Sequence, residues 1–306
     1  IGVSVGAVSA LVSSSISMLE AWRSDTMVAI VEAMEQEKGV GFSAGLIFWV
    51  ATASLFAVFG TAVVCLFEPA AAGSGIPQVM AYLNGVLISK VLNVRTFVAK
   101  FASVVMAVSG GLPVGAEAPL IQLGAIVGAG VTQGRSRTLG CSTQLFRAFR
   151  TTKDRRDFVT AGAACGVSAA FGAPIGGLLF VMEEVASFWG LEASGQAFLA
   201  SMVAFFTVAL FNTVIIGHNK GYVSSNAAVL FQVEYAGTMP LNIAAVLPAA
   251  VLGGVAGMLA ALFTRINLGV VRWRRHWSRR LDAEYAAARG PAVGSSMSAS
   301  VTRVFG

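Results

Sequence analysis

The stretch that decides the fold is Gly115-Ala116-Glu117-Ala118-Pro119, where one acidic residue stands in an almost uncharged run from Phe97 to Val131. A carboxylate at the depth of a bilayer costs about 2.5–3.5 kcal/mol, so such a residue is a functional-site candidate by default. The flanking glycine and proline also divide the run into two helices, with Glu117 at the division. We therefore predict a broken membrane helix that faces an anion.

A second break of the same kind is Gly73-Ser74-Gly75-Ile76-Pro77. The first backbone N–H groups of a helix have no intrahelical partner, and the peptide dipoles leave a partial positive charge there, so helix N-termini bind anions. We expect the glycines to allow close approach of an ion, Ser74 to cap the helix, and Pro77 to lie in its first turn. The alternative is an ordinary capped helix start.

Composition places the whole chain in a membrane. Of its 306 residues, 56% are hydrophobic and 12% are charged, against about 25% charged residues in an average soluble domain. Its 34 glycines suit helices that pack closely in lipid, and the spacings Gly162–Gly166 and Gly172–Gly176 predict tight helix contacts. We predict an all-α, polytopic membrane protein with broken or re-entrant helices. The expected full spans are Phe42–Phe67, Gln196–Ile216 and Leu241–Phe263, with a broken pair between Phe158 and Trp189.

Two basic clusters, within residues 135–156 and 272–280, belong on the cytoplasmic side by the positive-inside rule. No nucleic-acid-binding module accompanies them, so we expect no nucleic-acid partner. The three cysteines are widely spaced and indicate neither a disulfide framework nor a metal site. We find no metal-ligand cluster or nucleophile–base pair in the spans, so we expect neither a cofactor nor an enzyme.

The acidic residues suggest how an anion and protons could share one path. An ionised Glu117 can occupy the anion site at the following helix N-terminus, and a protonated Glu117 can swing away; the alternative is a capping glutamate in a loop. Glu183 and Glu184 end another apolar run and point about 100° apart. One of them could face a proton path, or both could mark the water interface.

At this point the chain resembles the CLC family of chloride channels and chloride/proton exchangers. The break at residues 73–77 is similar to the family's first filter motif, and the break at residues 115–119 to its second. The following helix pair is similar in Ala169-Ala170-Phe171-Gly172-Ala173-Pro174 and Phe180-Val181-Met182-Glu183-Glu184. Ala186-Ser187-Phe188-Trp189 looks most like the eukaryotic endosomal and lysosomal branch.

The resemblance implies roles for individual residues. Ser74 becomes the central chloride ligand, Glu117 the gate and external proton carrier, and Glu184 the internal proton-transfer group. The chloride-binding set is then Gly73, Ser74, Gly75, Ile76, Pro77, Gly115, Glu117 and Ala118. The implied activity is chloride/proton antiport in an acidic-organelle membrane by a homodimer, and accessory subunits stay undefined. The alternatives are an uncoupled chloride channel and a non-conducting half-length subunit.

The sequence departs from the family pattern in two ways. Ala116 and Ala118 stand where the second motif usually has a cation and a glycine, which predicts weaker anion attraction. The match covers only the first of the family's two inverted halves, and sites of such repeats form at their interface. Because Ile1 is not a plausible start, we expect a truncated sequence. We assign residues 1–280 to the transmembrane domain and residues 281–306 to a flexible tail.

Overall fold

The computed structural model describes residues 1–38, 41–86, 88, 90–133, 149, 151–216 and 246–289. In these ranges the chain is helical and has no strand, as the composition predicts. The chain divides into two compact units, Ile1–Gln232 and Val233–Gly306. Each unit is therefore described by itself.

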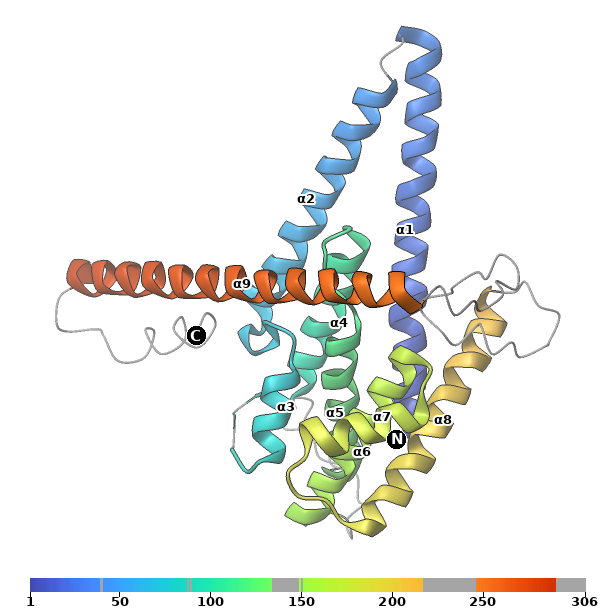
Figure 1. The fold of residues 1–306 in the computed structure, drawn as a ribbon, viewed down its shortest axis with the longest axis vertical. Helices are drawn as coiled ribbons and strands as arrows, with labels where there is room; N and C mark the ends of the chain where they lie inside the picture. The colour runs from blue at the N-terminus through green and yellow to red at the C-terminus, as the bar shows by residue number, and fades with distance from the viewer. Residues whose placement is uncertain are drawn as a thin grey trace. The chain divides into compact units, whose positions relative to one another are not determined.

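The first unit begins with two long helices, α1 (Gly2–Lys38) and α2 (Gly41–Phe67). They meet at the end of a helical hairpin and diverge from it, as Figure 1 shows. The polar residues that follow Leu19 continue the same helix to Lys38. In α2 only Gly41, Gly45 and Gly60 are buried, so an almost wholly apolar helix exposes its large side chains. A helix of this kind suits contact with lipid.

The core of this unit is the crossing of α5 (Glu117–Gln133) and α6 (Thr152–Phe171). A Cβ added at Gly124 would overlap the carbonyl oxygen of Gly162, and the reverse also holds. A Cβ at Gly166 would lie 2.5 Å from the Leu120 carbonyl oxygen. Glycine therefore lets the two backbones touch, as the Gly162–Gly166 spacing predicts for tight helix contact.

The same sequence rule fails for Gly172 and Gly176. Gly172 has φ 64° and ends α6 as its left-handed C-cap, so it is a turn residue. A Cβ at Gly176 would meet only Ala173 of its own segment. The predicted helix contact is wrong here because the chain leaves the helix between the two glycines, and their spacing of four no longer places them on one face.

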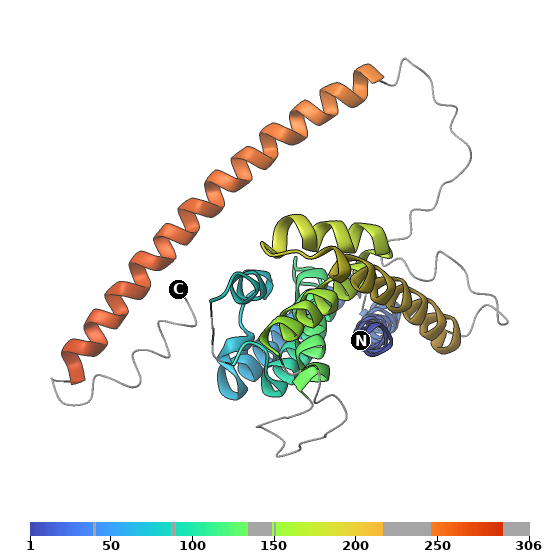
Figure 2. The same ribbon diagram turned by 90° about the horizontal axis from the view of Figure 1, so that it is seen from below.

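Small residues also bring α1 onto α8 (Leu191–Ile216). A Cβ at Gly2 would lie 2.5 Å from the Ala200 carbonyl oxygen, and one at Gly6 would lie 2.7 Å from that of Ala204. Figure 2 shows the start of α1 beside α8. The opening segment is therefore packed into the unit along its first turns.

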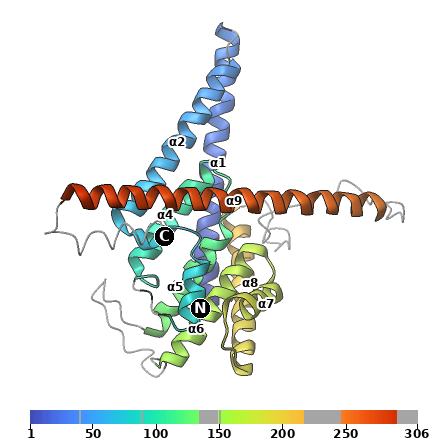
Figure 3. The same ribbon diagram turned by 60° about the vertical axis from the view of Figure 1, so that its left-hand side comes forward.

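Shorter elements connect these helices. They are η1 (Pro69–Ala71), α3 (Ile76–Leu83), α4 (Val94–Ser109), α7 (Pro174–Phe180) and the π-helical turn η3 (Val181–Val185). The predicted divisions between α4 and α5 and between α6 and α7 are both present. Helix α7 contacts α6 and α8 and lies beside α8 in Figure 3.

The second unit contains α9 (Val246–Arg289), a single long helix. Helix α9 extends beyond the predicted span Leu241–Phe263, through the basic run Arg272–Arg280 and into the predicted tail as far as Arg289. Arginine is a good helix former, so a basic run can end a membrane span without ending the helix. Residues 217–245, with the first residues of the predicted span Leu241–Phe263, and residues 290–306, with most of the predicted tail, lie outside the described residues.

Four helical segments of the described chain are long and apolar enough to cross a membrane: Gly2–Glu35, Gly41–Phe67, Glu192–Thr213 and Val246–Arg280. The predicted spans Phe42–Phe67 and Gln196–Ile216 fall within α2 and α8. The described part of Leu241–Phe263 falls within α9. These findings agree with a polytopic membrane protein.

Candidate functional site

The predicted first break is a turn of irregular backbone between η1 and α3. Gly73 has φ 80° and Gly75 has φ 90°, values that a residue with a side chain adopts only under strain. Helix α3 then starts at Ile76, with Pro77 in its first turn as predicted. We call residues 71–76 the filter turn.

One detail of the prediction is wrong. The N-cap of α3 is Gly75, and no side chain caps this helix. Ser74 lies one residue further out and is exposed. Because the chain passes through a left-handed conformation at Gly75, the serine is outside the usual capping position, and the first N–H groups of α3 keep no side-chain cap.

A buried lysine holds the filter turn. Lys100 is only 1% exposed, and its Nζ donates hydrogen bonds to the carbonyl oxygens of Ala71, at 2.8 Å, and Gly73, at 2.6 Å. Charge-assisted bonds of this length are the stronger class. Lys100 therefore fixes the backbone around Ser74 and places a cation beside the turn.

The sequence reasoning missed Lys100, although a signal was present. Lys100 is a charged residue inside the same apolar run as Glu117, and the rule that singles out Glu117 applies to it equally. The surroundings of Ala116 also fit the absence of a cation at this position of the second motif. Ala116 is buried in an apolar cluster with Val12 and Leu120, where a cation would be costly.

The predicted second break ends where α5 begins, at Glu117. The Leu120 N–H donates to the Ala116 carbonyl oxygen at 3.0 Å and closes the first turn. A Cβ at Gly115 would overlap the Oε2 atom of Glu117, so the carboxylate folds back over the bare backbone of this glycine. Glu117 therefore lies at a positive helix end, as the break predicts.

A side-chain contact brings the two breaks to one place. Gly75 packs against Gln122 of α5, because a Cβ at this glycine would overlap the carboxamide of Gln122. Gln122 follows Glu117 by five residues, or about 7.5 Å along the helix axis. The filter turn therefore lies beside the helix that starts with Glu117.

The turn η3, which contains Glu183 and Glu184, packs into the same core. Val181 and Val185 of η3 are buried with Val79 of α3 and Ile121 of α5. Between them, Glu183 and Glu184 are exposed. Extra turns of the π type often occur at functional sites. Helix α3, which follows Ser74, thus shares one apolar cluster with α5, which starts at Glu117, and with η3, which contains Glu184.

A second cation, also missed from the sequence, lies before Glu117. Arg23 of α1 is 2% exposed, and its Nη1 donates to the Ser109 carbonyl oxygen at 2.6 Å. Its guanidinium carbon lies 3.6 Å from the centre of the Trp49 ring, a cation–π contact. Arg23 therefore joins α1 and α2 to the segment that leads from α4 to Glu117.

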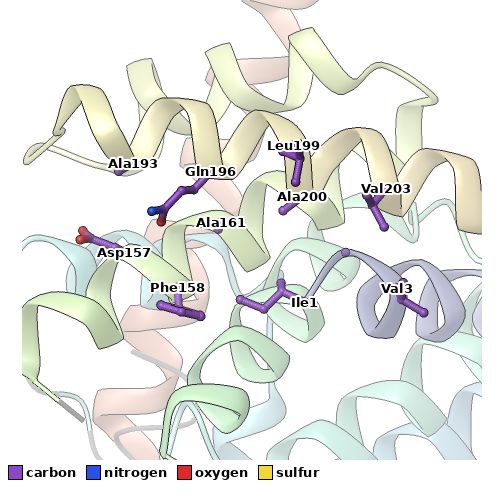
Figure 4. Close-up of a pocket in the computed structure, with 11 residues that line it drawn as sticks. Ile1, Val3, Asp157, Phe158, Ala161, Ala193, Gln196, Leu199, Ala200 and Val203 are labelled. Atoms are coloured by element: carbon purple, nitrogen blue, oxygen red, sulfur yellow. The ribbon is translucent and has the colours of Figure 1, made fainter. Parts of the chain in front are cut away.

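A pocket of about 370 Å³ lies elsewhere, between the start of α1, the start of α6 and α8 (Figure 4). Figure 4 shows Asp157 and Gln196 at one end, and apolar side chains such as Leu199 and Val203 along the rest. None of the predicted chloride-site residues lines it. The pocket is therefore separate from the predicted site.

The family model described as voltage gated chloride channel matches residues 53–305. The chain belongs to this family.

Relatives in the voltage-gated chloride channel family are similar over most of the chain. It is 41% identical over 244 residues to H(+)/Cl(-) exchange transporter 7 of Mus musculus, covering 80% of this chain and 30% of that protein. The Homo sapiens protein of the same name is 36% identical over 280 residues, with coverages of 92% and 34%. Chloride channel protein D of Dictyostelium discoideum is 42% identical over 222 residues, with coverages of 72% and 22%.

Two solved structures have a similar fold. A slow cyanobacterial Cl-/H+ antiporter aligns with a TM-score of 0.65 at 20% identity, covering 90% of this chain and 56% of that one. A eukaryotic CLC transporter aligns with a TM-score of 0.51 at 25% identity, with coverages of 67% and 38%. The fold is thus that of this family. The chain spans about a third of the length of the H(+)/Cl(-) exchange transporters 7 that it matches.

Proposed function

We propose that this chain contributes the first half of the ion path of a chloride/proton antiporter. The observation that carries the proposal is the meeting of the filter turn with α5, through Gly75 and Gln122, so that two helix N-termini lie close together in a protein of this family. The names of its mammalian relatives support exchange of chloride and protons.

Chloride binds in this proposal at the N-terminal ends of α3 and α5. In this proposal the backbone N–H groups of Gly73–Ile76 and of the segment from Gly115 to Ala118 face the ion, and the Ser74 hydroxyl donates to it. Pro77 has no N–H and contributes only the fixed backbone of the first helical turn. Lys100 supports the site from behind, because it binds carbonyl oxygens of the filter turn and so turns them away from an anion. A neutral hydroxyl with backbone donors can release the ion again.

Protons move in this proposal through two carboxylates. Glu117 competes with chloride for the N-terminus of α5 while it is ionised and leaves this position when it is protonated. Glu184 takes up protons on the internal side, from its exposed place in η3. The proposal includes a homodimer and a membrane of an acidic organelle, by analogy with the family.

The second candidate is an uncoupled chloride channel, which the names of the Dictyostelium relatives favour. The two candidates differ in whether chloride movement drives protons. Simultaneous recording of chloride and pH in liposomes that hold the purified full-length protein distinguishes them. In an antiporter, a chloride gradient drives protons across the liposome membrane and changes the internal pH. In a channel, the same gradient moves chloride alone.

Variants of the glutamates test the assigned roles. We expect Glu117→Ala to abolish chloride-driven pH movement while chloride flux continues, and Glu184→Gln to reduce proton movement. Glu183→Gln is the matched control, because its side chain points about 100° away on the same turn. If chloride still drives a pH change in Glu117→Ala, the gate assignment is wrong. If wild-type liposomes show no chloride-driven pH change, the channel is favoured.

A further inference from the structure

Gln122 is an unusual residue in α5. Its side chain is 0% exposed, and within the described chain both its amide nitrogen and its amide oxygen lack a hydrogen-bond partner. Buried polar side chains nearly always have a partner, so an unpaired carboxamide calls for an explanation. The sequence motifs do not include this residue, and the proposed function uses its contact with Gly75 without giving it a role toward the ion.

The carboxamide of Gln122 fills the space beside Gly75. A Cβ at position 75 would overlap its amide oxygen, and would lie 2.6 Å from its carbonyl carbon and 2.7 Å from its own Cβ. Gly75 is also held at φ 90° and is the N-cap of the eight-residue helix α3. Gln122 therefore touches the backbone from which the first N–H groups of α3 extend.

The filter turn is thus held by polar groups from two helices. Lys100 of α4 binds the carbonyl oxygens of Ala71 and Gly73, and Gln122 of α5 packs against Gly75. The amide atoms of Gln122 are buried, so an ion at the turn does not touch them. Gln122 can act on a bound ion only through the position of the turn and through the field of its own dipole.

We propose that Gln122 is a positioning residue that determines the anion preference of the filter turn. The proposal rests on the proposed function, since it concerns the ion that this turn binds. A carboxamide dipole in contact with Gly75 acts in a medium of low dielectric constant, where dipoles interact strongly. The field strength of coordinating dipoles is one basis of ion selectivity. By its contact with Gly75 the Gln122 carboxamide fixes the direction of the N–H dipoles of the turn itself, and the turn held in this way favours chloride, which is small and strongly hydrated, over larger and weakly hydrated anions.

The test replaces the dipole and keeps the shape. Gln122→Met preserves the length of the side chain and removes the carboxamide. Purified full-length protein in liposomes is assayed for chloride and thiocyanate flux under equal gradients. We expect the chloride-to-thiocyanate flux ratio to fall about fivefold, the effect of about one ordinary hydrogen bond. Gln196→Met, the same change at an exposed site of α8, is expected to leave the ratio unchanged.

The outcomes separate the two proposals. An unchanged ratio in folded Gln122→Met, or an equal loss of both fluxes, would overturn the inference and leave the proposed function in place. Wild-type liposomes without anion flux would overturn both. If Gln122→Met does not give monodisperse protein, Gln122→Asn takes its place, because the shorter side chain withdraws the carboxamide from Gly75. The same change in ratio is then expected.

Discussion

The crossing of α5 with α6 and the filter turn are both built on glycine, for different physical reasons. At the crossing, Gly124 and Gly162 allow backbone to touch backbone, and apolar side chains surround the contact. In the turn, Gly73 and Gly75 supply left-handed backbone, and buried polar side chains hold it. Helix packing in this chain thus depends on local spacing, whereas the candidate site depends on polar residues from distant helices.

Gly162→Ala should have the largest effect, because it breaks the crossing itself. The new Cβ would overlap the carbonyl oxygen of Gly124, and neither backbone can move without separating the helices. We expect the free energy of unfolding to fall by about 3 kcal/mol, at the upper end of ordinary overpacking. Thermal unfolding in detergent measures it.

Gly130→Ala is the matched control for this prediction, since no atom lies within 4 Å of a Cβ added there. The greater helix propensity of alanine should make this variant as stable as the wild type or more stable, by up to about 1 kcal/mol. Equal loss of stability in the two variants would contradict the idea that backbone contact decides the crossing.

Lys100→Met tests the filter turn and should have the second-largest effect. The substitution leaves the carbonyl oxygens of Ala71 and Gly73 without the cation that they bind. Each such bond is worth about 1.5–3 kcal/mol, and relief from burying the charge offsets part of the loss, so we expect about 2 kcal/mol of destabilisation. Chloride affinity should fall with it, as measured by titration calorimetry.

Arg95→Met provides the comparison, because Arg95 lies exposed on the same helix. A change at such a position usually stays within about 0.5 kcal/mol. If Lys100→Met proved as mild as Arg95→Met, the turn would be held by its own backbone, and the distinction between the two glycine regions would lose its basis.

Arg23→Lys probes the segment that leads to Glu117. Lysine keeps the charge but loses the planar group that stacks on Trp49 and the fixed direction of the bond to Ser109. We expect a loss of about 1 kcal/mol, the usual value of one cation–π contact. A double-mutant cycle with Trp49→Leu measures the coupling. Strictly additive effects would show that stacking contributes nothing.

Lys90→Gln should have the smallest effect. Lys90 Nζ lies 3.8 Å from Oε1 of the buried Glu68, which is beyond hydrogen-bond distance, and the Lys90 side chain itself is 65% exposed. Solvent screens such a pair, so we expect less than about 0.5 kcal/mol, and nothing measurable in high salt. A larger loss would mean that this exposed pair holds the chain at Glu68 as firmly as Lys100 holds the filter turn.

The positions of the helix breaks could be predicted because a few neighbouring residues determine where a helix starts or ends. Glycine, proline and an isolated carboxylate identify the starts of α3 and α5 without any knowledge of the fold. Two predictions were wrong, each at a position where a glycine with a left-handed conformation changes the course of the backbone. Gly75 takes the N-cap position in place of Ser74, and Gly172 ends a helix that the spacing rule treats as continuous. The roles of Ser74, Glu117 and Glu184 stay predictions.

The sequence by itself determined that this is a helical membrane protein with broken helices at residues 73–77 and 115–119, because hydropathy, glycine spacing and charge placement act within a few turns of one helix. Only the tertiary structure decided that Lys100, Gln122 and Arg23 hold these breaks. Lys100 lies in α4 and Gln122 in α5, whereas the filter turn that they contact lies before α3. Arg23 is 86 residues away from the Ser109 that it binds. Their partners are set by which helices pack together, and no local pattern encodes this.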